Sequence, residues 1–325
     1  MKAIRFHATG EVDVLRFEDV SDPSPGPGEY VIRVRAIGVN FADTRFRRGE
    51  YFIRPVFPQI PGMECAGEVI ARGEGATDHA VGDRVMALGA NAYASLLVCK
   101  AADLYPMPDG LGFDEAAALP VQALTAHHVL HLSGRMAKGE RVLVHAAAGG
   151  VGTLAVQLAK SAGAAQVVAT AGSEEKLALA RSLGADVAVS YKDDAWPARV
   201  KEATAGKGID VLLEMLGGTD ALRKNLGLLA PFGRMIVFGA ASGDTHGQIE
   251  PVTLMAKNLT VTGYYLTPLV RRRDLCAPPL AAMAADVAAK RLRVIIGARY
   301  PLGDAAEAHR ALEERRTTGK IILVP

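Results

Sequence analysis

A glycine-rich turn between an apolar run and a segment with helical character constrains this chain more than any other feature. Residues 142–144 are all apolar, and the turn that follows carries glycine at positions 149, 150 and 152. Apolar residues then recur at Leu154 and Leu158, one helical turn apart. A buried strand, a glycine turn and a helix in this order open a dinucleotide-binding unit.

The turn departs from the usual G-x-G-x-x-G pattern at its first position, which is Ala147. Gly149 would let the backbone approach a pyrophosphate, and Gly152 would let the helix pack close to its strand. Gly150 and Val151 would lie at the start of the helix, whose free N–H groups attract phosphate. An imperfect pattern also fits an ordinary strand-to-helix turn, so the rest of the chain must decide.

Composition excludes several classes of protein. The 325 residues, half of them hydrophobic, suffice for two domains with large cores, and a net charge of +2 gives no basic surface for nucleic acid. No apolar run approaches the length of a membrane span, and the first residues have no apolar signal core. The three cysteines are too scattered for a disulfide framework or a structural zinc site. We expect a cytoplasmic protein with no membrane or nucleic-acid partner.

The first third of the chain is predicted to be rich in strands. Residues 30–37 alternate apolar side chains with arginines, which is typical of a strand with one wet face. Short apolar runs bounded by glycines predict further strands at 68–71 and 83–88. Strands at this density favour a compact β-barrel-like domain, which an alanine-rich helical stretch at 113–132 would follow.

Strand and helix patterns alternate from residue 142 to residue 263. The predicted strands are 142–144, 166–170, 187–189, 209–213, 234–239 and 259–263. The helices predicted between them are 150–160, 174–183 and 221–229. This alternation argues for a parallel sheet with helices on both faces.

The last sixty residues do not continue that alternation. The predicted elements there are a helix at 280–290, a strand at 293–296, a helix started by a capping box of Asp304 and Glu307, and a strand at 320–324. We expect this tail to return to the first domain. The predicted divisions are therefore 1–122, 123–265 and 266–325.

Short motifs occur in a fixed order along the whole chain. They are GVNFADT at 38–44, GEY at 49–51, PGMECAGE at 61–68, GDRV at 82–85, LPVQALTA at 119–126, HAAAGGVG at 145–152, FG at 238–239 and GKIILVP at 319–325. This set resembles the medium-chain dehydrogenase/reductase superfamily, and within it the zinc-free quinone oxidoreductases related to zeta-crystallin. The resemblance implies an α/β protein in which a GroES-like β-rich catalytic domain is interrupted by a Rossmann domain with a doubly wound parallel sheet. It also implies a homodimer paired through edge strands near residues 259–264.

The resemblance bears on zinc. Zinc-dependent members place a cysteine where Asn40 stands and a histidine where Met63 stands. Methionine and asparagine are poor zinc ligands, so we expect no zinc. Asp43 and Glu64 are then expected to cap helices and pair with other groups.

The end of the second predicted Rossmann strand bears on the cofactor. Residues 170–173 contain no carboxylate at the place where NAD-preferring folds hold the ribose 2′-hydroxyl. Ser173 is expected to cap the next helix, and Lys176 in its first turn would pair with a 2′-phosphate, although two glutamates precede it. The resemblance adds Tyr191 at the adenosine end. We expect NADPH rather than NADH.

The resemblance assigns further residues to the nicotinamide end of the site. Additional cofactor contacts are expected from Asn40, Thr125, Phe238, Gly239 and Lys320. Asn40 would also donate a hydrogen bond near the acceptor oxygen, and Tyr51 would be the proton donor or oxyanion partner.

Three residues depart from the family pattern. Arg45, His127 and His128 stand where relatives often carry aromatic residues. They would either favour acidic or carbonyl-bearing acceptors or, for the histidines, simply satisfy a buried helix.

Without a metal to polarise an isolated carbonyl, a conjugated acceptor is the easier substrate, because the charge that arrives with the hydride is delocalised. We therefore expect an NADPH-dependent, zinc-free oxidoreductase that reduces quinones or α,β-unsaturated carbonyls by direct hydride transfer. Two alternatives stay open: an enoyl-thioester reductase, and a non-catalytic NADPH-binding protein like the lens crystallins of the family.

Overall fold

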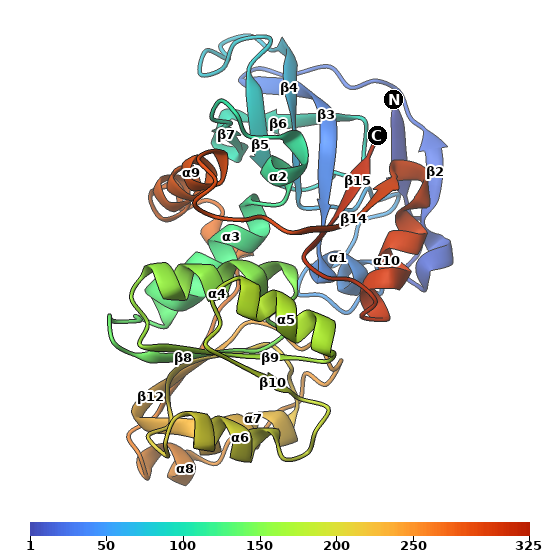
Figure 1. The fold of residues 1–325 in the computed structure, drawn as a ribbon. Coiled ribbons are helices and arrows are strands. Elements are labelled where there is room, and N and C mark those ends of the chain that lie inside the picture. Colours follow the sequence, from blue (N-terminus) through green and yellow to red (C-terminus); the bar gives the residue numbers. More distant parts are fainter. The chain divides into compact units, whose positions relative to one another are not determined.

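The structure, a computed structural model, describes residues 1–325. The chain forms two compact units, each with its own main sheet (Figure 1). Unit 1 consists of Met1–Leu124 and Thr267–Pro325, and unit 2 consists of Thr125–Leu266. None of the helices is both long enough and apolar enough to span a bilayer.

Unit 1 contains a seven-stranded sheet of order β14-β15-β3-β4-β5-β7, with β6 also paired to β3. All neighbours are antiparallel except β14 and β15, and a separate pair is formed by β1 and β2. The strands are β1 Lys2–Arg5, β2 Arg16–Asp19, β3 Glu29–Val39, β4 Glu64–Arg72, β5 Arg84–Leu88, β6 Leu96–Lys100, β7 Leu104–Pro106, β14 Ile296–Pro301 and β15 Lys320–Val324. The helices are α1 Phe41–Arg47, α2 Phe113–Ala117, α9 Arg273–Ala288 and α10 Ala305–Glu313, and α3 Pro120–His127 begins here and ends in unit 2.

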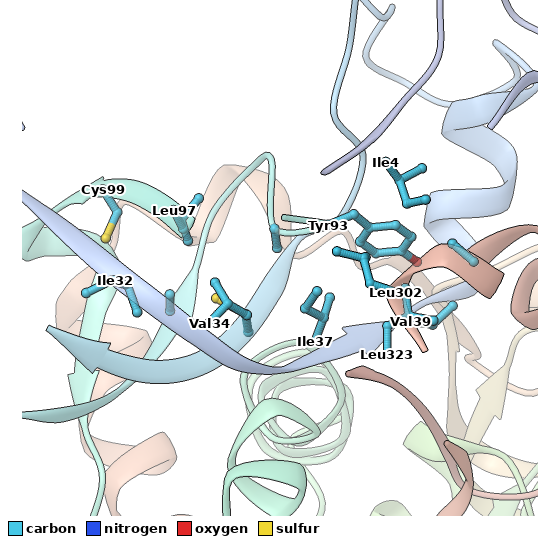
Figure 2. Close-up of a cluster of buried hydrophobic side chains, with 14 of the residues drawn as sticks. Ile4, Ile32, Val34, Ile37, Val39, Tyr93, Leu97, Cys99, Leu302 and Leu323 are labelled. Carbon is cyan, nitrogen blue, oxygen red and sulfur yellow. The ribbon is translucent and has the colours of Figure 1, made fainter. Parts of the chain in front are cut away.

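Strand β3 carries the core of unit 1. Its arginines at 33 and 35 are exposed, as the alternation predicted. A register shift against β4 between Val34 and Ala36 then changes which side chains face inward. Strand β3 contributes Ile32 and Val34 before the shift and Ile37 and Val39 after it (Figure 2). The shift lets one long strand serve a single continuous core.

Arg47 is the largest fully buried side chain of the protein, and it ties three segments of unit 1 together. Its guanidinium donates to Glu313 of α10 at 2.8 Å, to the Gly10 carbonyl at 3.1 Å and to Nδ1 of His309 at 3.3 Å. A buried guanidinium is tolerated only when its donors are engaged in this way.

Unit 2 is a six-stranded, fully parallel sheet of order β10-β9-β8-β11-β12-β13. The strands are β8 Arg141–Val144, β9 Gln166–Ala171, β10 Val187–Ser190, β11 Ile209–Glu214, β12 Leu229–Val237 and β13 Thr260–Gly263. The helices are α4 Gly150–Ser161, α5 Glu174–Ser182, α6 Trp196–Ala203, α7 Thr219–Leu228 and α8 Pro251–Met255, and a π-helical turn, η3 His128–Ser133, follows α3. Helices α4 and α5 cover one face of the sheet, and α6 and α7 cover the other (Figure 1).

The predicted Rossmann architecture of unit 2 is confirmed. Strands β8, β9 and β10 step outward in one direction, and β11 then returns to pair with the other side of β8. Ligands of doubly wound sheets bind at such a reversal, outside the carboxyl ends of the strands.

Two predictions for the tail were wrong in their boundaries. The helix expected at 280–290 begins seven residues earlier, as α9, and contains Pro278 and Pro279. Arg273 anchors its first turn by donating to two carbonyls before and within β7 and by stacking on Tyr105, and one face of the helix is buried. Tertiary packing therefore outweighs the two missing N–H donors. The strand expected at 293–296 is displaced and begins at Ile296, because pairing with β15 sets its register.

The predicted capping box of α10 is not formed. Asp304 makes no side-chain hydrogen bond to the helix, and the Glu307 carboxylate pairs with Arg310 and Arg316 instead. Two nearby guanidinium groups compete better for this carboxylate than one backbone N–H does.

Replacing Glu313 should test the buried position of Arg47. Glu313→Leu removes the carboxylate that pairs with the buried Arg47 guanidinium at 2.8 Å and also with Arg48, and it leaves Glu11, at 3.9 Å, as the ionic partner of Arg47. The variant should lower the free energy of unfolding by about 3–5 kcal/mol, measured by urea-induced unfolding. Glu307→Leu, on the same helix but in an exposed ion pair, is the matched control and should have a much smaller effect. Equal losses in the two variants would contradict the role assigned to Arg47.

Candidate functional site

The glycine turn lies at the carboxyl end of β8, beside the reversal in strand order. Gly149 is the N-cap residue of α4, and its N–H donates to the Ala146 carbonyl at 2.8 Å. A Cβ on Gly152 would lie 2.3 Å from that same carbonyl oxygen, so only glycine lets α4 approach the turn this closely. Ala147, in the place of the first fingerprint glycine, is wholly buried and donates to the Thr170 carbonyl at 3.0 Å.

Gly150 and Val151 form the first turn of the twelve-residue helix α4. The first N–H groups of a helix have no partner within it and carry its positive dipole end. This end of β8 therefore has the geometry of an anion-binding turn.

The end of β9 brings together three of the predicted cofactor residues. As predicted, Ser173 caps α5, and its hydroxyl accepts from the Lys176 N–H at 3.4 Å. A Cβ on Gly172 would lie 2.7 Å from the Tyr191 hydroxyl, so Tyr191 lies against this glycine. The carboxylate of Glu174, one of the two acids before Lys176, pairs with Arg181 at 2.5 Å. No carboxylate stands at the end of the strand itself, from 170 to 173.

Phe238 and Gly239 follow β12 on the far side of the reversal. The Phe238 N–H donates to the Glu214 carbonyl at 2.9 Å, and a Cβ on Gly239 would meet Met215 at 3.3 Å. Thr125 is buried on α3. The structure thus places most of the predicted cofactor residues of unit 2 at the carboxyl ends of its strands.

In unit 1, Asn40 stands between β3 and α1 and bridges a buried ion pair. The Lys320 ammonium donates to Asn40 Oδ1 at 2.7 Å and to Glu64 Oε1 at 2.5 Å. Asn40 Nδ2 donates to the same Glu64 oxygen at 2.8 Å and approaches the Gly38 carbonyl at 3.4 Å. The Lys320 and Glu64 side chains are 1 % and 0 % exposed, so the amide of Asn40 is held in one orientation from both ends.

Glu64 also reaches α3. Its second oxygen, Oε2, accepts from the Val121 N–H at 2.7 Å, in the first turn of that helix. A carboxylate at a helix N-terminus satisfies an orphan donor and complements the dipole. The expected pairing and capping role of Glu64 is therefore found.

Asp43 caps α1 by accepting from the Asn40 N–H at 2.8 Å. Tyr93 donates to the same carboxylate oxygen at 3.1 Å, and the Tyr93 hydroxyl lies 3.0 Å from Nε2 of His309. Because Arg47 can only donate, it fixes Nδ1 of His309 as an acceptor, and Nε2 then carries the proton toward Tyr93. A directed chain of donors thus ends on Asp43.

Burial controls the protonation of this chain. It raises the pKa of Asp43 to about 7, against the opposing effects of the Asn40 N–H, Lys320 and Tyr93. Burial, with the nearby Arg47 charge, lowers the pKa of His309 to about 3, so this imidazole is neutral at physiological pH.

The remaining predicted residues lie in simpler surroundings. Tyr51 follows α1 in a loop where its ring contacts that of Phe52, which is 80 % exposed. Arg45 pairs with Glu50 at 2.8 Å. Nδ1 of His128 lies 3.0 Å from the Tyr264 hydroxyl, and burial and two neighbouring histidines lower the pKa of His127 to about 4. Arg45, His127 and His128, the three departures from the family pattern, therefore bring no unpaired positive charge to the site.

Sequence reasoning missed the buried partners of the predicted residues. Tyr93, His309 and Arg47 in unit 1 were not singled out, and neither were His145, Glu214 and Asn225 in unit 2. The available signal was a charged or imidazole side chain directly after an apolar strand, as at His145 and Glu214.

The raised pKa of Asp43 predicts a pH-dependent contribution to stability. Its pKa of about 7 in the folded protein exceeds the value of about 4 in the unfolded chain, so the folded state holds the proton more tightly. The free energy of unfolding of the wild type, minus that of Asp43→Asn, should therefore fall as the pH rises from about 4 to 7, by about 4 kcal/mol at most. Urea unfolding of both proteins across this range measures the difference, in which the opposing titration of the histidines cancels. A flat or rising difference would contradict the assignment.

Comparisons with known proteins can now be set beside this geometry. Residues 26–126 match the family model described as an alcohol dehydrogenase GroES-like domain, and residues 150–275 match one described as a zinc-binding dehydrogenase. A quinone oxidoreductase of Pseudomonas aeruginosa is 38 % identical over 100 % of this chain and 99 % of its own length. The human quinone oxidoreductase is 33 % identical over 100 % of this chain and 98 % of its own length.

A solved structure agrees over the whole chain. The crystal structure of Escherichia coli quinone oxidoreductase complexed with NADPH is 32 % identical, with a TM-score of 0.94 and full coverage of both chains. Together with the GroES-like and Rossmann folds, these similarities show that the chain belongs to the quinone oxidoreductase branch, related to zeta-crystallin, of the medium-chain dehydrogenase/reductase superfamily.

Proposed function

We propose that this protein is an NADPH-dependent reductase of quinones or α,β-unsaturated carbonyls that works without zinc. The observation that carries the proposal is the buried triangle of Asn40, Glu64 and Lys320, in which an ammonium and a carboxylate hold the amide of Asn40, the residue that stands where zinc-dependent members of the family place a cysteine. Such a site offers a fixed hydrogen-bond donor and no Lewis acid, which suits an acceptor whose own conjugation delocalises charge.

The residues of unit 2 fit NADPH. The pyrophosphate would be held by the turn of Gly149, Gly150, Val151 and Gly152. This turn has no room for a Cβ at position 152 and presents the N–H groups at the start of α4. Ser173, Lys176 and Tyr191 would hold the adenosine 2′-phosphate end, where no carboxylate repels it, and Thr125, Phe238 and Gly239 would line the nicotinamide end. When bound, NADPH supplies the hydride. The NADPH complex of the Escherichia coli relative supports this choice.

Zinc does not fit the residues of unit 1. Asn40 and Met63 offer an amide oxygen and a thioether, neither of which competes well for zinc. The Lys320 ammonium lies 2.7 Å from that amide oxygen, so a divalent cation there would meet a like charge. No group of three or more His, Cys, Asp and Glu side chains in residues 1–325 is arranged to hold a metal ion.

On this proposal, Asn40 is the donor to the acceptor oxygen. One hydrogen of its amide is engaged by Glu64, whereas the other has only the Gly38 carbonyl at 3.4 Å, a weak contact that an acceptor oxygen would replace. Lys320 polarises the same amide through Oδ1 and places a positive charge near the developing oxyanion. Lys320 would then also favour a bound anionic cofactor. Tyr51 or water would supply the proton that completes the reduction.

We also propose a homodimer in a reducing cytoplasm. Strand β13 is the outer strand of its sheet, with one edge unpaired in the chain, and Phe232, Val252 and Met255 expose apolar side chains by 65–75 %. Pairing of two β13 edges would cover both features. All three cysteines are buried and unbridged, which suits a reducing compartment.

Lys176→Ala should weaken NADPH binding about tenfold and leave NADH binding nearly unchanged, because only NADPH carries the 2′-phosphate. Nucleotide fluorescence titration measures both affinities. Lys160→Ala, which removes a lysine at the far end of α4 that pairs with Asp186, is the matched control and should change neither. Equal losses for the two nucleotides would rule out the phosphate role of Lys176.

The function itself is tested by following NADPH absorbance with a panel of quinones, enals and enoyl-thioesters, alongside zinc analysis of the purified protein. We expect oxidation of NADPH by quinones or enals at full rate without zinc. A preference for enoyl-thioesters would establish the alternative reductase activity, and binding of NADPH without turnover of any acceptor would establish a non-catalytic protein. Stoichiometric zinc would contradict the zinc-free proposal.

A further inference from the structure

Four buried polar side chains form a chain across the carboxyl ends of three strands in unit 2. Nδ1 of His145, which follows β8, lies 2.8 Å from the Thr170 hydroxyl of β9, and its Nε2 lies 2.9 Å from Asn225 Oδ1 of α7. Asn225 Nδ2 donates to Glu214 Oε2 at the end of β11. None of the four side chains has more than 1 % of its surface exposed.

The chain has one direction, which Glu214 sets. A carboxylate only accepts, so the Asn225 amide must point its NH2 group at Glu214 and its oxygen at His145. His145 therefore carries its proton on Nε2 and accepts from Thr170 on Nδ1. Burial lowers the pKa of His145 and keeps it neutral, against the opposing effects of Glu214 and Asn225.

The other carboxylate oxygen of Glu214 holds the loop that follows β11. Oε1 accepts from the Leu216 N–H at 2.5 Å and from the Gly217 N–H at 2.8 Å. A buried carboxylate is costly unless fixed hydrogen-bond donors replace the water that it has lost. Here the buried Glu214 carboxylate holds the loop in a specific geometry and adds little to the packing of the sheet.

That loop is joined to the segment after β12. The Ala241 N–H donates to the Met215 carbonyl at 2.9 Å, and the Ser242 N–H donates to the Leu216 carbonyl at 2.8 Å. A Cβ on Gly217 would lie 2.5 Å from the Asp244 carbonyl oxygen, so the two segments touch backbone to backbone. The four hydrogen-bonded side chains thus link the glycine turn after β8, through Glu214, to the residues that follow Phe238 and Gly239.

We infer that Glu214, Asn225 and His145 are positioning residues of the cofactor site: they fix the spacing between the pyrophosphate turn and the paired loops at the nicotinamide end before the cofactor arrives. This inference rests on the proposed binding of NADPH. Pre-organisation of this kind raises affinity because fewer groups must be ordered on binding.

Glu214→Leu removes both loop anchors and should raise the Kd for NADPH at least about tenfold, by nucleotide fluorescence titration. Asp210→Leu is the matched control. Asp210 lies on the same strand, at its opposite end, where it pairs with Arg141 at 2.8 Å. Both variants should lower the thermal stability of the protein, but Asp210→Leu should leave the Kd for NADPH unchanged.

Glu214→Gln should bind NADPH with a Kd within about threefold of the wild-type value. The glutamine oxygen still accepts from the loop, and the donors and acceptors of the hydrogen-bonded side chains can exchange roles. Its amide would donate to Asn225, Asn225 to Nε2 of His145, and Nδ1–H of His145 to Thr170. Nitrogen-15 NMR of the imidazole then distinguishes the two proteins: Nε2–H in the wild type and Nδ1–H in the variant. The tautomer exchange tests the direction of the hydrogen-bond network, and the Kd tests its effect on the cofactor site.

If Glu214→Leu does not fold, Asn225→Leu takes its place. It interrupts the hydrogen bonds between Glu214 and His145 but keeps both hydrogen bonds from Glu214 to the loop, and its Kd for NADPH should rise at least about threefold. A folded Glu214→Leu or Asn225→Leu protein that binds NADPH as the wild type does would overturn the inference alone. The same tautomer in wild type and Glu214→Gln would also overturn it. Failure of the wild type to bind NADPH would instead overturn the proposed function and remove the basis of the inference.

Discussion

The buried carboxylate of Glu64 is the interaction on which the site in unit 1 depends. It lies on β4, and its two oxygens take all their partners from elsewhere: the amide of Asn40, the ammonium of Lys320 on β15, and the first turn of α3. A carboxylate that has lost its water must recover that stabilisation from fixed donors, and the donors are thereby fixed as well. One group thus determines where the amide of Asn40, the proposed hydrogen-bond donor, can lie.

The sequence predicted the elements whose signals are local. The apolar run of β8, the glycine turn and the Ser173 cap each act within a few residues, and each was found where expected. Helix α9 and strand β14 were misplaced because contacts distant in sequence set their limits: Arg273 against the β7 segment, and β15 beside β14. Helix α6 has weak local signals and is buried mainly through Trp196 and Val200, so only the folded sheet defines it.

The candidate site also contains some residues that local signals predict and others that only the fold brings together. Glycines, a missing acid and a lysine in the first turn of α5 are properties of a short stretch, so residues 149–152, Ser173 and Lys176 could be named in advance. The supporting groups could not, because Arg47 and His309 are 262 positions apart and meet only in the fold. An isolated charge in an apolar run, such as Glu214, looks like a surface residue until its partners are known.

The burial of the three cysteines has a consequence for the electrophilic acceptors proposed above. Quinones and enones alkylate thiolates, the reactive form of cysteine. Burial raises the pKa of Cys65, Cys99 and Cys276, so each remains a protonated thiol at neutral pH. The chain therefore offers no exposed thiolate that the acceptors proposed above could alkylate.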